Sequence, residues 1–134
     1  MAEREIDPLT HAGASALALG RIGLGLGIVA FTRPALRVLG FPKPDGAALT
    51  LARLAGGRDI AMGIQGWIAR DDPDELRRSV LLIAAGDAGD ALAFGAAVAG
   101  REGINRTAAM NAPFAASAVV LGAIVGSRLR RPRD

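Results

Sequence analysis

The stretch Arg53-Leu-Ala-Gly-Gly-Arg-Asp-Ile-Ala-Met-Gly63 sets two opposite charges, Arg58 and Asp59, side by side within a long apolar segment. That segment, 49–69, is long enough to cross the hydrocarbon core of a bilayer, which takes about 20 residues of helix. A charge at its centre costs about 2.5–3.5 kcal/mol on insertion scales, so Asp59 should face protein and have a partner. The stretch therefore predicts a membrane-spanning helix with a buried charge cluster at mid-depth.

The chain has four such apolar segments, each of which we interpret as a membrane-spanning helix: 13–31, 49–69, 79–99 and 108–127. A polar leader, 1–12, precedes them and a basic tail, 128–134, follows them. We therefore expect one domain and an all-α fold, a bundle of four transmembrane helices with both termini on the same side of the membrane.

Small residues dominate the apolar content of the chain. Hydrophobic residues make up 51% of it and aromatic residues only 4%. In the first segment, small residues at helical spacing form one smooth stripe, of the kind that suits close helix packing in lipid: Ala16, Gly20, Gly23 and Gly27. The chain has no cysteine, which excludes disulfides, thiol redox chemistry and cysteine-ligated metals.

The positive charges of the chain gather at the ends of the apolar segments. The sequence pI is about 10.9, yet this distribution of arginine is typical of membrane proteins, and we expect no nucleic-acid partner. Eight positive residues fall on the side of the termini: Arg4, Arg70, Arg77, Arg78, Arg128, Arg130, Arg131 and Arg133. Five fall on the opposite side: Arg33, Arg37, Lys43, Arg101 and Arg106. The excess predicts that both termini are cytoplasmic.

Five charged residues lie near the middle of the predicted spans and form the candidate site: Arg21, Arg58, Asp59, Asp87 and Asp90. Asp87 and Asp90 are three residues apart and share one helix face. Three further residues are possible neighbours of this cluster: Gln65, Arg53 and Asn111. The single histidine, His11, lies in the leader without a second histidine to complete a metal site, so we expect no metal and no cofactor.

The candidate cluster has three carboxylates and two guanidinium groups, which leaves one negative charge in excess. A buried carboxylate in excess tends to hold a proton. One hypothesis is therefore a site that binds or transports a small polar ligand, a cation or a proton. The favoured hypothesis is an accessory or assembly subunit, whose charges only hold the helices together and whose partners are lipid and a larger membrane protein or further copies of itself.

An enzyme is the third hypothesis, and the sequence offers little for it. The chain has one histidine and no cysteine, and no nucleophile lies beside a base. The Asp87-x-x-Asp90 spacing resembles the metal motifs of lipid phosphotransferases, but the further aspartates of those enzymes are absent. We therefore do not expect catalysis.

Three motifs together resemble a family of small four-helix bacterial membrane proteins: Gly20-Arg-Ile-Gly-Leu-Gly25, Leu54-Ala-Gly-Gly-Arg-Asp-Ile-Ala-Met-Gly63 and the Asp87/Asp90 pair. The family is a domain of unknown function that is loosely similar to DoxX-like proteins. The resemblance covers about residues 17–98. It implies a multi-pass protein of the bacterial inner membrane, and it assigns no activity.

A soluble four-helix bundle is the alternative fold. The charges of segments 49–69 and 79–99 are compatible with it. Segments 13–31 and 108–127, however, are apolar around most of their circumference, whereas a soluble helix has a polar stripe. We therefore favour the membrane bundle.

Overall fold

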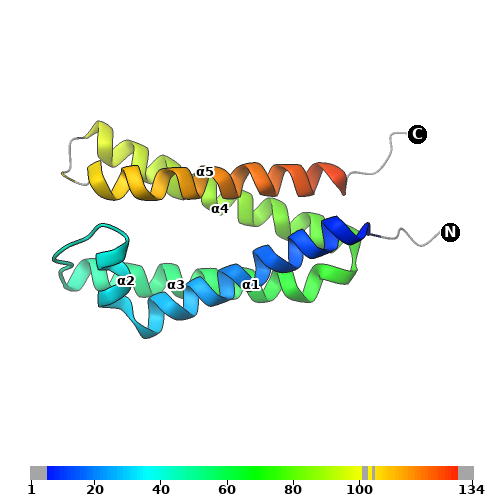
Figure 1. Cartoon of the computed structure of the whole chain (residues 1–134), viewed down its shortest axis with the longest axis horizontal. Helices are drawn as coiled ribbons and strands as arrows, with labels where there is room; N and C mark the ends of the chain where they lie inside the picture. The colour runs from blue at the N-terminus through cyan, green and yellow to red at the C-terminus, as the bar shows by residue number, and fades with distance from the viewer. Residues whose placement is uncertain (1–5, 101–102, 104, 130–134) are drawn as a thin grey trace.

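The computed structural model describes residues 6–100, 103 and 105–129. This part of the chain contains one short 3-10 helix, η1 (Ala69–Asp71), and five α-helices: α1 (Pro8–Ala30), α2 (Thr32–Val38), α3 (Gly46–Ile68), α4 (Pro73–Ala99) and α5 (Asn105–Arg128). The described residues include no strand, so the all-α prediction is confirmed. Figure 1 shows four long helices lying side by side, with α2 at one end of the bundle.

Three of the long helices are apolar enough to cross a membrane: α1, α4 and residues Arg106–Arg128 of α5. Helix α3 has the same length as α1, but three charged residues, Arg53, Arg58 and Asp59, fall within every 18-residue stretch of it. The predicted span 49–69 is therefore a long helix whose own composition does not mark it as a span.

The helices extend beyond the predicted spans at their N-terminal ends. Helix α1 begins at Pro8, inside the predicted leader, and α4 begins at Pro73 instead of residue 79. Both starts depend on an aspartate cap that precedes a proline. Asp72 accepts hydrogen bonds from the backbone N–H groups of Asp74 and Glu75, at 2.9 and 3.0 Å. The charged beginning of the leader, 1–5, and most of the predicted tail, 130–134, lie outside the described residues.

Asp7 caps α1 in the same way. The Thr10 hydroxyl donates to its carboxylate, and the Thr10 backbone N–H donates to it at 3.0 Å. These hydrogen bonds, that of the hydroxyl first, hold the pKa of Asp7 below its ordinary value. A negative charge is thus kept at the positive end of the α1 dipole.

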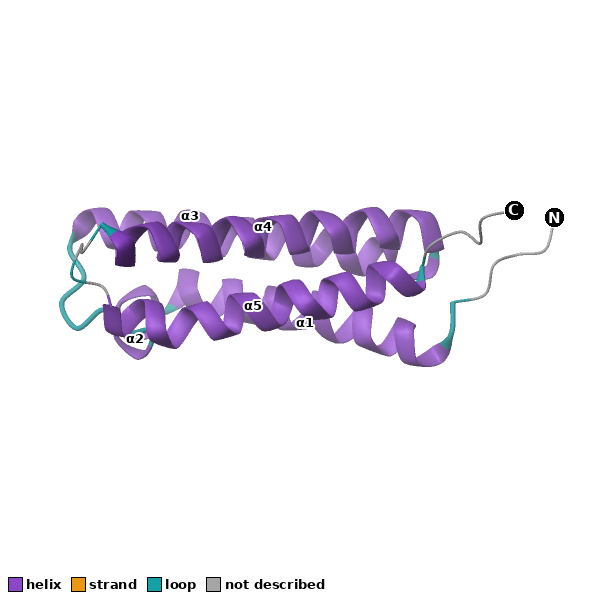
Figure 2. Ribbon diagram, turned by 90° about the horizontal axis from the view of Figure 1, so that it is seen from above, coloured by secondary structure: helices purple, strands orange, loops and turns teal. Residues whose placement is uncertain are grey.

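The bundle consists of two tightly packed antiparallel pairs, α1 with α3 and α4 with α5. Figure 2 shows that the four long helices run nearly parallel along the whole length of the molecule. The start of α1 and the end of α5 lie at the same end of the bundle. Ile6, just before α1, packs there on a buried cluster that includes Ala14, Leu76 and Leu129, the last of which directly follows α5. The 3-10 helix η1 lies at this end as well, where His11 contacts Asp71 at 3.1 Å.

Close contact of backbones joins α1 to α3. A Cβ atom on Gly25 would lie 2.5 Å from the carbonyl oxygen of Gly56, and one on Gly63 would lie 2.7 Å from that of Ala18. Only glycine permits helices to approach so closely, and the resulting contact area replaces the hydrophobic effect as the force that joins helices in lipid. These contacts fix which residues of α1 and α3 lie at the same depth.

The packed face of α1 is not the stripe of small residues that the sequence suggests. Ala14, Ala18 and Gly25 are buried, whereas Gly20 and Gly23 are exposed, with no atom near the position of a Cβ. Small residues at helical spacing occur on both faces of α1, so their spacing does not distinguish the two. The packed face is the one that also carries Arg21.

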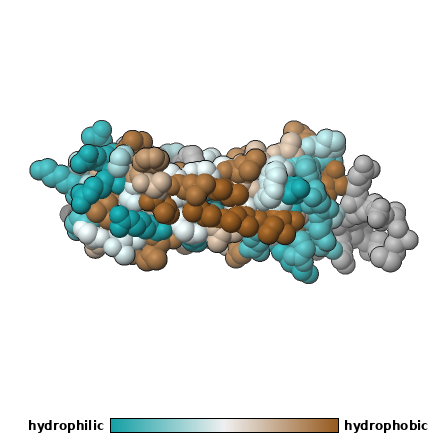
Figure 3. Space-filling model, turned by 90° about the horizontal axis from the view of Figure 1, so that it is seen from below, coloured by the Kyte–Doolittle hydropathy of each residue, from teal (hydrophilic) through white to brown (hydrophobic). Residues whose placement is uncertain are grey.

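Large apolar side chains cover the outside of the bundle. Leu19 and Leu24 of α1, Leu54 of α3 and Leu121 of α5 are all exposed. Figure 3 shows hydrophobic residues over the middle of one face and hydrophilic residues gathered at both ends. An apolar middle of this extent between polar ends is typical of a protein that is surrounded by lipid.

We predict that Gly25→Ala lowers the free energy of unfolding by about 1–3 kcal/mol, because the new methyl group overpacks the contact with Gly56. The loss should occur although alanine is a better helix former than glycine by roughly 1 kcal/mol. Gly23→Ala is the matched control, since nothing lies within 4 Å of its Cβ position. Unfolding in detergent, followed by circular dichroism, measures both. Equal stability of the two variants would contradict the α1–α3 contact.

Candidate functional site: an arginine–aspartate network

Three helices contribute to a network of charged side chains in the middle of the bundle. Its members are the five residues that the sequence singles out: Arg21 of α1, Arg58 and Asp59 of α3, and Asp87 and Asp90 of α4. Each helix places its charges near its own midpoint, and the antiparallel packing brings these midpoints to the same level. The structure thus joins all five residues through ion pairs.

Arg21 is the residue that connects the three helices. Its Nη1 donates to Oδ1 of Asp59 at 2.9 Å, and its Nη2 donates to Oδ1 of Asp87. The three side chains retain only 12%, 9% and 8% of their exposure, so these pairs are shielded from the surroundings. A buried pair of this kind is strongly destabilising to break, because the remaining charge loses its compensation.

Arg58 forms the outer part of the network. Its guanidinium group makes a two-point contact with the Asp90 carboxylate, through Nη1–Oδ1 at 3.0 Å and Nη2–Oδ2 at 2.7 Å. Nη2 also donates to Oδ1 of Asp59 at 3.3 Å. The Arg58 and Asp90 side chains are 39% and 40% exposed, so this pair lies at the surface of the bundle.

Asp59 lies between the inner and outer parts. Its Oδ1 accepts from both Arg21 and Arg58, and it therefore links α1 to the α3–α4 surface. Asp87 differs, because its Oδ2 is buried and has no hydrogen-bond partner within the described residues. The network also holds three carboxylates and two guanidinium groups, so it has one carboxylate in excess.

Within the described residues, no hydrogen bond or ion pair links the three possible neighbours to these five residues. Gln65 lies on the same face of α3 as Arg58, two helical turns toward the η1 end. Arg53 is exposed and has no ion pair within the described part of the chain. Asn111 donates to the carbonyl oxygens of Leu39 and Thr107, so it joins α5 to the end of α2.

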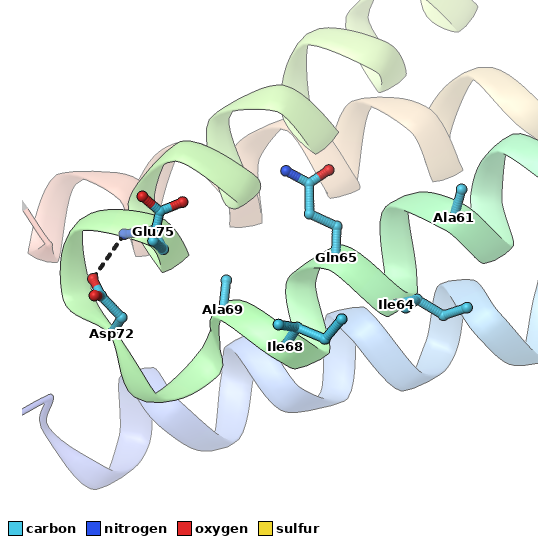
Figure 4. Close-up of a pocket in the computed structure, with 7 residues that line it drawn as sticks. All are labelled: Ala61, Ile64, Gln65, Ile68, Ala69, Asp72 and Glu75. Atoms are coloured by element: carbon cyan, nitrogen blue, oxygen red, sulfur yellow. Dashed lines mark hydrogen bonds between the residues drawn. The ribbon is translucent and has the colours of Figure 1, made fainter.

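A groove that the sequence does not indicate lies between α3 and the start of α4 (Figure 4). It has a volume of about 350 Å³ and seven lining residues: Ala61, Ile64, Gln65, Ile68, Ala69, Asp72 and Glu75. None of the five network residues lines it. Asp72 already accepts two backbone hydrogen bonds and Glu75 pairs with Arg78 at 2.6 Å, so the polar groups at its mouth have partners.

No group of three or more metal-ligating side chains occurs among the residues that the structure describes. In the network, each carboxylate faces a guanidinium group, which repels a cation. The arrangement is suited to holding helices together.

Comparison with protein-family models, with curated proteins and with solved structures finds no match for this chain. The similarity of its motifs to DoxX-like proteins therefore stays a prediction from the sequence.

We predict that Arg21 and Asp59 behave as one unit in a double-mutant cycle. Arg21→Gln leaves Asp59 and Asp87 without their inner donor and should cost about 3–5 kcal/mol of stability. Asp59→Asn should cost about 1–3 kcal/mol. The double variant should lose less than the sum, with a coupling of about 0.5–3 kcal/mol.

Detergent unfolding curves of the wild type, the two single variants and the double variant give the coupling energy. Arg53→Gln is the control, and as an exposed change it should stay within about 0.5 kcal/mol of the wild type. Costs of Arg21→Gln and Asp59→Asn that simply add would show that the two side chains are independent.

Proposed function

We propose that the protein is an integral membrane protein with four spans that serves as an accessory or assembly subunit. In this proposal the arginine–aspartate network has a structural role, and it keeps the helices in one fixed arrangement that a partner recognises. The observation that carries the proposal is the contact of Arg21 with both Asp59 and Asp87, because it ties three helices together at one point.

The packing of α3 supports its assignment as a membrane span, in addition to the three helices α1, α4 and α5. Helix α3 runs antiparallel to α1, and the two backbones are in close contact at Gly25–Gly56 and again at Ala18–Gly63. If α1 crosses the membrane, α3 has to lie at the same depth. Its charges are compatible with this position, because Asp59 faces Arg21 rather than lipid.

Side chains at the end of α3 are suited to a membrane surface. The Arg70 guanidinium lies 4.2 Å from the centre of the Trp67 ring and donates to the Trp67 carbonyl oxygen at 2.8 Å. Tryptophan collects at the boundary between lipid and water, and arginine extends its charge toward the headgroups. The level of Trp67 and Arg70 then marks one surface of the membrane.

We predict that the two ends of the bundle lie on opposite sides of the membrane. The chain has no native cysteine, so single cysteines report position cleanly. Lys43→Cys, in the α2–α3 connection, should react with an impermeant thiol reagent in intact cells. Arg78→Cys, near the start of α4, should react only after lysis, because the excess of arginine at that end favours the cytoplasm.

Lysed cells are the control for this labelling, since both cysteines must then react. Labelling of Arg78→Cys alone in intact cells would reverse the orientation. Labelling of both or of neither in intact cells would contradict a bundle that crosses the membrane.

A second candidate function, proton binding or relay, is favoured by one observation at Asp87. Its Oδ2 is buried without a donor, while the network as a whole has one carboxylate in excess. In this candidate Asp87 exchanges the proton, and Arg21 orients the carboxylate through its other oxygen. The same site, with Asp59 and Asp90, would serve a small polar ligand, whereas a cation is disfavoured because a guanidinium group faces each carboxylate.

Purification of the tagged protein from native membranes tests the accessory role against this second candidate. We expect a different membrane protein to be recovered in fixed stoichiometry. The matched variant is Arg21→Gln, which should lose the partner because the helices lose their arrangement, while Arg53→Gln should retain it. A preparation that carries a small molecule and no protein partner would refute the accessory role and support the binding site.

A further inference from the structure

One face of α3 is exposed along its length and has the spacing of a helix–helix seam. Six exposed residues follow one another at alternating intervals of three and four: Leu51, Leu54, Arg58, Ala61, Gln65 and Ile68. This is the spacing of the a and d positions of a heptad, which places all six side chains on one stripe. Within the part of the chain that the structure describes, no helix covers the stripe.

Helix α4 continues this surface with small residues. Leu82, Gly89 and Ala93 are exposed, and they share a face with Gly86 at the same intervals of three and four. Nothing lies within 4 Å of a Cβ at Gly89. Small residues on such a face permit the backbone of another helix to approach closely.

The outer ion pair lies in the middle of this face. Arg58 has five N–H donors, of which three are used by Asp59 and Asp90. The remaining N–H groups belong to a side chain that is 39% exposed at mid-depth, where lipid has no acceptor to offer. Among the described residues of α1 and α5, none that is exposed at this depth carries a charge, and the polar one, Ser117, already has a partner. The α3–α4 face is therefore the one that requires a polar partner.

A second copy of the same chain supplies that partner by symmetry. Two copies inserted in the same orientation are related by a two-fold axis along the membrane normal. Because Arg58 and Asp90 lie side by side at one level, this rotation sets Arg58 of each copy opposite Asp90 of the other. Four charges of alternating sign then form a closed ring, and each guanidinium group gains an acceptor.

We propose that the α3–α4 face is the interface of a homodimer, in which Arg58 and Asp90 of the two copies pair reciprocally. The inference rests on the proposed insertion in the membrane. The groove lies on this face beyond the ion pair, since Ala61, Gln65 and Ile68 belong both to its lining and to the α3 stripe. Its volume of about 350 Å³ provides room for side chains of the second copy.

Cysteine cross-linking in native membranes tests this interface in the full-length chain. Ala61→Cys on α3 and Gly89→Cys on α4 place a thiol on the proposed interface. Leu19→Cys on α1 and Leu121→Cys on α5 are controls, because they are exposed near the same depth on other faces. A short bifunctional thiol reagent should give roughly tenfold more dimer at positions 61 and 89, since docking raises the effective concentration of the thiols.

Equal yields at all four positions would indicate random collision and would overturn the dimer. A product at position 61 with the mass of a different protein would assign the face to another partner and would also overturn it. Counting of bleaching steps on labelled protein in dilute lipid vesicles is an independent measure, and it should give two steps per particle. Single steps would refute the dimer.

The proposed membrane insertion can fail separately from the dimer. Insertion is judged by the labelling of Lys43→Cys and Arg78→Cys, whereas the dimer is judged by the contrast between interface and control cysteines. A strong contrast without spanning topology would leave a homodimer whose α3–α4 face is buried outside a membrane.

Discussion

The arrangement of α1, α3 and α4 depends on the two contacts of Arg21. A guanidinium group in the middle of an apolar helix is unfavourable in lipid unless carboxylates compensate it, and here two of them do, from two different helices. Asp59 and Asp87 are equally unfavourable alone. Each of the three charged side chains is therefore stable at its position only when the other two helices are in place. The three charges thus favour one arrangement of the helices and disfavour alternative arrangements.

Backbone contact determines whether these charges can meet. The Gly25–Gly56 and Ala18–Gly63 contacts hold α1 and α3 close together and set their relative position along the axis, with Arg21 between the two contacts. On the other side of the bundle, a Cβ on Gly122 would lie 2.9 Å from the Cβ of Ala84, so α4 and α5 are joined in the same manner. Between the two pairs, fewer contacts are made, and ion pairs replace them. The bundle thus combines close backbone packing within each pair with ion pairs that, through Asp87 and Asp90 of α4, also join the two pairs.

The sequence predicts much of this fold and part of the network. The mid-depth charges are conspicuous because apolar residues surround them, and all five predicted residues meet in the structure. Their pairing was not predictable, since Asp59 follows Arg58 directly and yet lies closer to Arg21, at 2.9 Å against 3.3 Å. That choice depends on the register between α1 and α3, which a single sequence does not contain.

The packed face of α1 was ambiguous for a similar reason, because both of its faces carry small residues. The groove near Gln65 needs the turn at η1, which brings Asp72 and Glu75 beside the end of α3.

The two halves of the network differ in exposure, and this difference has a physical consequence. Arg21, Asp59 and Asp87 are enclosed, so their pairing is completed within one chain. Arg58 and Asp90 make equally short contacts, yet both remain about 40% exposed, with donors of Arg58 left over. The stability of a single chain does not require this outer pair. Apolar residues in place of Arg58 and Asp90 would avoid the cost of placing charges in lipid. A pair of opposite charges on an otherwise apolar face selects its partner instead, because a wrong surface leaves both charges uncompensated. The inner pairs therefore determine how the chain folds, while the outer pair is suited to determining what the folded chain binds.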